Sequence, residues 1–474
     1  MSVPLAAGNS SYDSVPVALL RNGESPNDVK VTGNIGLGVA VDRRERAGQL
    51  ACALPGFLDA IRDVVVIASS SRSGSSVFTE ILRHSRRLLH LPGEMNPFMR
   101  LAGLCWPQSG SGSDHLGPEH AVASTIQALE SYLSTEAGEL LPLGPNEAPG
   151  DEFAWRLYWR LTLQWPLEPI TPEDVSVWSE AALEDVRGLR GGSCDWNEDL
   201  QLFHAMFLRR VRARHNVVNP YYYDLDKTII EATFEDLKPP SGAPGPLVIE
   251  EPPFVLIRPW RRPEDWFSRP LVIKTPSNVY RLEFLRALFP HARFHVLHLT
   301  RNPAASINGI YEGWRHWGFH SHYVGCQLRL RDYPGDEHAD RGWWKFDLPP
   351  DWDEYTGRPL NEVCAFQWWS AHEAILQFVR DTDVDYRRVK FESIVGGEET
   401  RVRTFTDVHE WCVGTADAAF LEAAARSFRP VMAVTAPRPN RWRRNQNILE
   451  PVLRDKRIRA LAAELGYADE ADWL

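Results

Sequence analysis

One segment constrains the fold more than any other: a β-branched apolar run that leads directly into a turn of small polar residues. Residues 63–68 read Asp-Val-Val-Val-Ile-Ala, which is typical of a strand buried on both faces of a parallel sheet. The Ser- and Gly-rich residues 69–76 follow, and residues 77–89 have the apolar spacing of a helix. Strand, turn and helix in this order predict the first βα unit of a parallel sheet.

The rest of the chain repeats this alternation of strand and helix. Further strands are expected at residues 270–274, 293–299 and 385–391. Helices are expected at residues 279–288, from 303 to about 317, and at 362–380. The predicted fold class is α/β, a three-layer sandwich with a central parallel sheet and right-handed crossovers. In such a sheet, ligands bind beyond the carboxyl ends of the strands.

The sequence predicts three parts. Residues 1–60 are an N-terminal extension, with a short strand expected at 36–41. The core comprises residues 61–104 and 270–474, and residues 105–269 form a largely helical insertion. Within the insertion, the clearest helices are at residues 121–133 and 199–214, and a Pro- and Gly-rich linker spans 238–246.

Charge is distributed unevenly. The 474 residues carry a formal net charge of −11, which disfavours a general nucleic-acid or anionic-membrane binder, because both need a basic face. Residues 114–199 hold 17 acidic and 4 basic side chains, a net of −13, leaving +2 for the remainder. The acidic segment is thus superimposed on a near-neutral protein, and its role is left open.

Cysteine usage and hydropathy favour a soluble cytoplasmic protein. The six cysteines form no CxxC pair, so zinc-ribbon and thioredoxin interpretations fail. The first residues lack the basic and apolar regions of a signal peptide, and no apolar stretch is long enough to span a membrane.

The turn after the first strand has the chemistry of an anion site. Small residues let backbone N–H groups approach an anion, a helix N-terminus adds positive potential, and Arg72 supplies a cation. It is not a Walker A loop, because no glycine precedes Arg72 at the right distance and no Lys follows Gly74. An ordinary Ser-rich βα turn is the alternative. The candidate anion-binding residues are Ser71, Arg72, Ser73, Gly74, Ser75 and Ser76.

Residues 67–78 resemble the 5′-phosphosulfate loop of sulfotransferases that use 3′-phosphoadenosine 5′-phosphosulfate (PAPS). The similarity is to the bacterial branch with an Arg-Ser-Gly loop, distantly similar to carbohydrate and protein-tyrosine sulfotransferases. This resemblance implies a P-loop-NTPase-like sulfotransferase fold.

Two further motifs resemble the family elements that contain the reacting groups. Residues 91–95 (LPGEM) resemble the element with the family's catalytic base, which implies that role for Glu94. Residues 272–276 (VIKTP) resemble the Lys-x-Pro element, which implies that Lys274 contacts the transferring sulfate and stabilises developing charge.

The last two motifs concern the nucleotide. Residues 289–303 resemble the 3′-phosphate strand, and the resemblance implies that Arg301 grips that phosphate. The family's serine eight residues later is replaced by Gly309, so Ser306 or Asn308 is the expected substitute. Residues 438–445 resemble the loop that closes over the nucleotide, with Arg441, Trp442 and Arg443 as candidate contacts. Residues 426–447 contain six arginines and no acid, as a phosphorylated ligand would require.

The resemblance implies transfer of a sulfuryl group from PAPS, the co-substrate, to a hydroxyl of a small-molecule, carbohydrate or natural-product acceptor. No metal is expected, and His316, His320 and His322 are interpreted as satisfied or acceptor-site histidines. The acceptor pocket is expected from the insertion and from the Trp-rich residues 311–369, of which 320–360 are expected to be mostly loop. The alternative is that many of these tryptophans are core residues.

A P-loop-type kinase and a catalytically silent nucleotide-binding module are the alternatives. The kinase would need a Walker lysine and a Mg²⁺-binding acid at a strand end, and neither arrangement is clear. The identity of the acceptor and the oligomeric state are not determined by the sequence.

Overall fold

The computed structural model describes residues 56–144, 147–240, 249–326, 328–331, 333, 342–415, 417–426, 428–433 and 437–473. The strand expected at 36–41, nearly all of the N-terminal extension and most of the linker at 238–246 lie outside the described residues.

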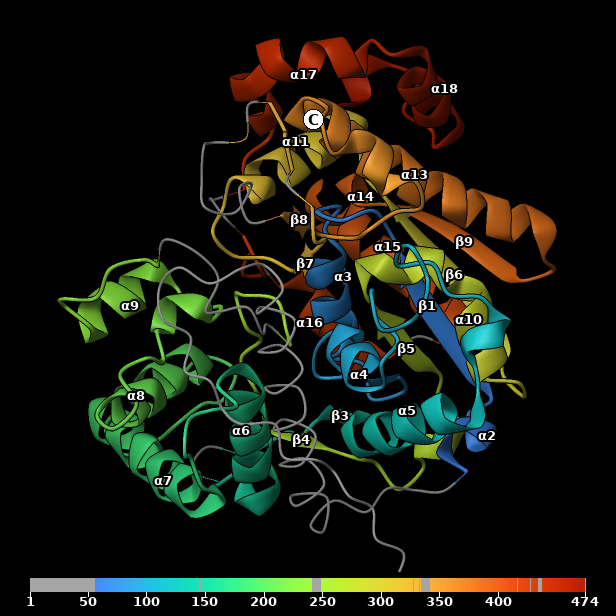
Figure 1. The fold of residues 1–474 in the computed structure, drawn as a ribbon. Coiled ribbons are helices and arrows are strands. Elements are labelled where there is room, and N and C mark those ends of the chain that lie inside the picture. The colour runs from blue at the N-terminus through green and yellow to red at the C-terminus, as the bar shows by residue number, and fades with distance from the viewer. Residues whose placement is uncertain are drawn as a thin grey trace, which may run out of the picture.

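A five-stranded parallel sheet forms the centre of the protein (Figure 1). Its spatial order is β2 (Leu89–His90), β5 (Leu271–Lys274), β1 (Asp63–Ala68), β6 (Arg293–Thr300) and β9 (Asp385–Lys390). The four strands expected after residue 60 are all present. Strand β2 was not expected, because it has only two residues and lies where a helix was predicted to continue to residue 89.

The pleat of β1 directs alternate side chains into two different cores. Val64 and Val66 join the core that contains residues of α10 (Leu282–Leu288) and α13 (Leu360–Asp381). Val65 and Ile67 join the core that contains residues of α3 (Ser75–Leu82), α15 (Glu398–Val413) and α16 (Ala418–Ala425). Both faces of the sheet are therefore covered by helices, and the predicted three-layer α/β class is confirmed.

The helices between β2 and β5 group largely to one side of the sheet (Figure 1). They are α4 (Asn96–Leu101), α5 (Ala123–Glu136), α6 (Gly150–Gln164), α7 (Pro172–Leu189), α8 (Leu200–Arg212) and α9 (Lys227–Thr233). Strands β3 (Glu139–Leu140) and β4 (Trp260–Arg261) form a short antiparallel pair in this region. Trp159 and Phe203 belong to the same apolar cluster as Val64, so this helical part shares a continuous core with the sheet.

The chain after β6 builds a second apolar cluster. Helix α11 (Pro303–Trp314) ends three residues before the expected boundary, and an antiparallel pair, β7 (Ser321–Tyr323) and β8 (Trp343–Lys345), lies in the expected loop. The remaining helices are α2 (Phe57–Ala60), α14 (Glu392–Val395), α17 (Gln446–Leu453) and α18 (Lys456–Glu464). The 3₁₀ turns are Pro118–His120, Pro220–Tyr222, Trp266–Ser268, Pro276–Tyr280, Trp352–Tyr355, Arg441–Asn445 and Glu470–Asp472.

A buried ion pair ties several of these elements together beneath the carboxyl end of the sheet. Arg281 Nη2 donates to Asp114 Oδ1 at 2.6 Å, and Arg281 Nη1 donates to Asn96 Oδ1 at 2.8 Å. Asp114 Oδ2 in turn accepts from the Leu348 N–H at 2.8 Å. Because both charged side chains are fully buried, their geometry depends on every one of these bonds.

Replacing Arg281 with Met should destabilise the protein by about 3–5 kcal/mol, because Asp114 is then left as an uncompensated buried charge. Urea unfolding followed by tryptophan fluorescence measures the change. The matched control is Arg426→Met, which removes an exposed ion pair with Glu422 and should cost less than about 1 kcal/mol. Equal losses in the two variants would contradict this interpretation.

Candidate functional site

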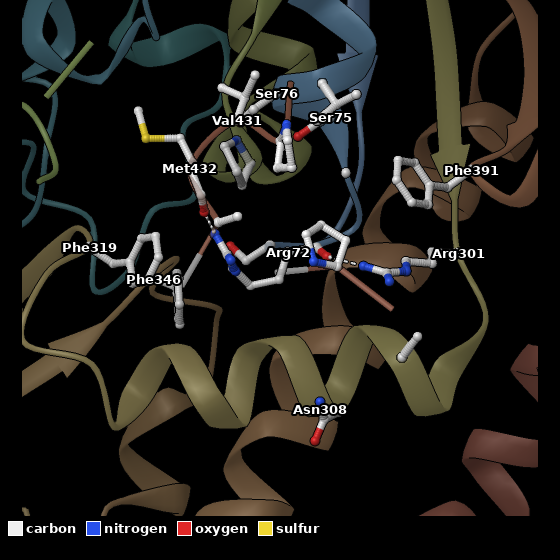
Figure 2. A pocket seen from close by; sticks show the side chains of 18 of the residues that line it. Arg72, Ser75, Ser76, Arg301, Asn308, Phe319, Phe346, Phe391, Val431 and Met432 are labelled. Carbon is white, nitrogen blue, oxygen red and sulfur yellow. Dashed lines mark hydrogen bonds between the residues drawn. The ribbon is translucent and has the colours of Figure 1, made fainter. Parts of the chain in front are cut away.

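The described residues form a cavity of about 550 Å³ beyond the carboxyl ends of β1, β5 and β6. Its volume lies in the range of small-molecule binding sites. The cavity is lined by charged residues that are far apart in the sequence: Arg72, Glu94, Lys274, Arg301 and Arg441. Figure 2 shows Arg72 near the middle of the view, with Phe319 and Phe346 on one side and Arg301 on the other.

The loop after β1 is shaped by glycine and by hydroxyl bonds. Gly74 has φ +93°, and a Cβ there would lie 2.3 Å from the Phe391 ring, so only glycine fits. Ser70 Oγ and Ser73 Oγ are 2.6 Å apart, and Ser71 Oγ donates to Asp347 Oδ1 at 2.7 Å. These bonds hold the backbone in a fixed turn at the N-terminus of α3.

Ser75 and Ser76 start α3 and line the cavity, with their backbone N–H groups in its first turn. Ser71 and Gly74 also line it, whereas Ser73 is fully buried with its Oγ 3.4 Å from Ser306 Oγ. The start of α3 therefore offers the backbone donors and positive potential that an anion needs.

Arg72 occupies a constrained position inside the cavity. Its backbone has φ +63°, its Nη1 donates to the Met432 carbonyl at 3.0 Å, and its guanidinium lies 4.4 Å from the centre of the Phe319 ring. Burial lowers the pKa of Arg72 to about 10; the charge of Glu251 opposes this shift, and the charges of Arg441 and Arg301 add to it. The side chain is therefore still a cation at neutral pH, and the cavity holds it in place before any ligand binds.

Arg301 lies at the end of β6 and faces the same loop. Its Nη1 donates to the Arg72 carbonyl at 3.3 Å, and its guanidinium stacks 4.9 Å from the Phe391 ring centre. Burial lowers the pKa of Arg301, and the nearby Arg441 charge adds to the effect, whereas Glu392 opposes it. Two neighbouring arginines with depressed pKa values mark a site that would be stabilised by an anion.

The geometry of α11 distinguishes Ser306 from Asn308, the two residues expected to substitute for the serine that Gly309 replaces. A Cβ at Gly309 would lie 3.0 Å from the Arg72 Cβ, so a serine there would crowd the loop. Ser306 is fully buried behind the loop. Asn308 lines the cavity and accepts from Asn445 Nδ2 at 2.7 Å, which leaves Asn308 as the more accessible of the two candidates.

The C-terminal basic loop closes one end of the cavity. Arg441 forms an ion pair with Glu312 at 2.6 Å, and Arg441 and Trp442 line the cavity together with Arg438. Arg443 is exposed and lies outside the cavity lining, with its guanidinium 4.9 Å from the Trp442 ring centre.

Glu94 and Lys274 meet at the other end of the cavity. Lys274 Nζ donates to Glu94 Oε1 and, at 3.0 Å, to Ser76 Oγ. The side chains of Glu94 and Lys274 are only 12% and 8% exposed, so water screens their attraction weakly. The Met95 N–H also donates to Thr275 Oγ1 at 2.7 Å, which fixes the two segments beside each other.

Several cavity residues were not identified from the sequence. Glu251 comes from the end of the insertion, Phe319 lies just before the expected loop, and Phe346 and Asp347 come from within it. None belongs to a motif. The pair of carboxyl groups in Glu250-Glu251, set between an apolar stretch and two prolines, was the one available signal for Glu251.

Both regions expected to build an acceptor pocket contribute residues to the cavity, but the described residues of the acidic segment and the tryptophans do not. Among the described residues of the acidic segment 114–199, none lines the cavity, and many of its acids pair with local arginines, as in Glu136–Arg156 at 3.0 Å. The cavity lining also contains none of the seven tryptophans between 311 and 369. Trp314, Trp344, Trp352 and Trp368 instead pack in the second apolar cluster, where their large apolar surfaces are buried.

The three histidines that follow α11 differ in their surroundings. His316 Nδ1 accepts from the Gly318 N–H at 3.0 Å, and His322 lies 3.6 Å from Asp114. His320 lines the cavity. The described ranges contain no cluster of three or more His, Cys, Asp or Glu side chains arranged to hold a metal ion. They also contain no helix with the length and apolar character needed to cross a bilayer.

The fold and site together define an α/β protein with a cavity at the carboxyl end of a parallel sheet, lined by arginines, a lysine and carboxyl groups. No family model and no curated protein matches the chain. Similar solved structures include the sulfotransferase domain from the curacin biosynthetic pathway, with 11% identity, coverage of 86% of this chain and 98% of that chain, and a TM-score of 0.32. Another is the sulfotransferase STF9 from Mycobacterium avium, with 13% identity, coverage of 90% and 83%, and a TM-score of 0.33. At these TM-scores the likeness carries no argument about this chain.

Asp347 accepts a hydrogen bond from the loop after β1, and its ionisation can be tested. Its two oxygens accept from Ser71 Oγ at 2.7 Å and Tyr280 Oη at 3.2 Å, and burial raises its pKa to about 6. Because the folded pKa is higher than the unfolded value, ionisation opposes folding increasingly as pH rises from about 4 to 6. The stability of Asp347→Asn relative to the natural protein should therefore improve by about 1–3 kcal/mol between pH 4.5 and 7.5.

Urea unfolding at the two pH values measures this change in the difference between the proteins. Other titrating groups cancel because they are common to both. A difference in stability that is independent of pH would show that Asp347 is already ionised at pH 4.5 in the folded protein, so that burial does not raise its pKa.

Proposed function

We propose that the protein is a PAPS-dependent sulfotransferase that moves a sulfuryl group to a hydroxyl of a small-molecule, carbohydrate or natural-product acceptor and releases adenosine 3′,5′-bisphosphate. The observation that carries this proposal is the convergence of the five charged motif residues on one cavity. Arginines line one part of it, and the Glu94–Lys274 pair lines another. A doubly phosphorylated donor and a hydroxyl acceptor need these two kinds of surroundings side by side.

The residues of the arginine-lined part suit the donor. Arg301 and Asn308 would hold the 3′-phosphate, and Arg72 with the first N–H groups of α3 would hold the 5′-phosphosulfate. Arg441 and Trp442 would close over the nucleotide. PAPS supplies a sulfuryl group linked to phosphate by an S–O bond, which breaks as the acceptor oxygen forms its new bond to sulfur.

The residues of the other end suit the acceptor. Glu94 would take the proton that the acceptor hydroxyl loses, and Lys274 would stabilise the negative charge that develops on the leaving phosphate oxygen. Lys274 is bonded to Glu94 and to Ser76, so its ammonium lies between that carboxyl group and the start of α3, which supports these roles. Fixed charges of this kind need little rearrangement during the reaction.

The first test of the proposal is the recognition of the 3′-phosphate. Replacing Arg301 with Met should weaken binding of adenosine 3′,5′-bisphosphate about 10- to 100-fold, because charge-assisted hydrogen bonds to that phosphate are lost. Binding of adenosine 5′-monophosphate, which lacks the 3′-phosphate, should change by less than about threefold. Isothermal titration calorimetry measures both affinities, and the exposed Arg403→Met is the matched control.

The same calorimetry separates the alternatives. Tighter binding of ADP with Mg²⁺ than of adenosine 3′,5′-bisphosphate would favour a P-loop-type kinase. Binding of the bisphosphate without sulfuryl transfer to any acceptor in a broad screen would favour a silent nucleotide-binding module. Absence of bisphosphate binding to the natural protein would contradict the proposed donor.

The second test concerns the base. Glu94→Gln should reduce turnover about 10²- to 10⁴-fold, because glutamine cannot accept the proton, while the affinity for adenosine 3′,5′-bisphosphate at pH 7 should stay within about threefold. Release of the bisphosphate measures turnover, and the exposed Glu398→Gln is the control. A Glu94→Gln protein with full turnover would exclude Glu94 as the base.

A further inference from the structure

Glu251 is a second carboxyl group near Glu94, and the mechanism above does not use it. The His320 N–H donates to Glu251 Oε2 at 3.2 Å, and the Phe319 N–H donates to the carbonyl of the next residue, Pro252. These backbone bonds attach the end of the insertion to the turn after α11. They hold the Glu251 side chain in the lining of the same cavity that contains Glu94.

The elements packed against Glu251 bring charged groups of both signs. Its neighbour Glu250 is directed elsewhere, because it accepts from Arg160 Nη1 at 3.1 Å. Burial lowers the pKa of the histidines at 316 and 320, so these side chains are neutral at pH 7. The titratable groups on the surrounding elements are Glu94, Lys274, Arg72, His316, His320, Lys345 and Asp347.

The two cations nearest to Glu251 along the cavity already have partners. Lys274 is bonded to Glu94 and Ser76, and Arg72 is bonded to the Met432 carbonyl. Within the part of the chain that the structure describes, Glu251 forms no ion pair of its own. An ionised Glu251 would therefore place a second negative charge beside Glu94 without a dedicated counter-charge.

An anionic donor makes this arrangement less favourable. Its phosphate and sulfate oxygens would draw on the positive charge of Lys274 and Arg72, which together with the hydrogen bond from the His320 N–H offsets a charge on Glu251. Building on the sulfotransferase function proposed above, we propose that Glu251 is a proton-carrying residue of the transfer site and is neutral whenever the donor nucleotide is bound. A neutral carboxyl group can also donate a hydrogen bond into the cavity, which a carboxylate cannot.

The electrostatics of the free protein also favour a neutral Glu251 at pH 7. Burial raises the pKa of Glu251 to about 8, and the negative charge of Glu94 contributes in the same direction, whereas Lys274, the His320 N–H and Arg72 oppose the shift. The neutral acid is then the main form at pH 7, and the free protein loses the proton as pH rises through about 8. Nucleotide binding above that pH must restore the proton, so affinity should fall as pH rises.

Calorimetry of adenosine 3′,5′-bisphosphate binding from pH 7 to pH 9 tests this proposal. The natural protein should lose affinity about tenfold over this range, because binding becomes linked to uptake of nearly one proton. Titrations in buffers of different ionisation enthalpy count that proton directly. Glu251→Gln, which mimics the neutral side chain, should bind as the natural protein does at pH 7 and lose both the alkaline decrease and the proton uptake.

Two further measurements make the outcome independent of one variant. Glu94→Gln removes the neighbouring negative charge, so the alkaline decrease should move to lower pH. Infrared titration of the free protein should show a neutral carboxyl band that disappears between pH 7 and 9 and is absent from Glu251→Gln. The exposed Glu398→Gln should behave as the natural protein in each assay.

The inference fails if Glu251→Gln retains the alkaline decrease and the proton uptake of the natural protein. It also fails if the infrared band is absent from the natural protein. Failure of the proposed function has a different signature: the natural protein then does not bind the bisphosphate at pH 7, whatever the infrared titration shows about Glu251.

Discussion

Repulsion among gathered cations is the constraint on which the site depends. Arg72, Arg301 and Arg441 approach closely enough that each of the two buried ones has its pKa lowered partly by its neighbours. The protein balances this repulsion with Glu312, which pairs with Arg441. It also uses backbone carbonyls, which accept from Arg72 and Arg301 without adding a full negative charge. The cations are thereby held in place while still favouring an anion.

Much of the fold follows directly from local sequence. The run at residues 63–68 forms β1 within its expected bounds, because continuous β-branched residues suit a strand covered on both faces. Strand β2 was missed because two residues carry no periodicity, and its position is set by pairing with β5. The tryptophans after α11 show the limit of composition. Their enrichment is consistent with either a ligand pocket or a core, and only tertiary packing places Trp314 in the core.

Some residues of the candidate site could also be predicted from local sequence, and others could not. Arg72, Glu94, Lys274 and Arg301 could be predicted because each lies in a short motif at a strand end, where a parallel sheet brings such residues together. Glu251 could not be predicted, because it lies outside the motifs and reaches the cavity through backbone bonds to the turn after α11. Contacts of this kind depend on the path of the chain between elements, which local patterns do not encode.

The distribution of charge also has a physical explanation once the fold is known. Acids of the segment 114–199 pair with arginines of the same helical region, as between Asp185 and Arg210 at 2.6 Å, and the described ones stay outside the cavity. The net charge of the chain therefore says little about the potential at the site. That potential is set by a few groups that line the cavity: three arginines and a lysine, opposed by carboxyl groups whose ionisation is itself controlled by burial. A protein with an acidic average can thus present a positive potential at one cavity, because partial burial reduces the contact of its cations with screening water.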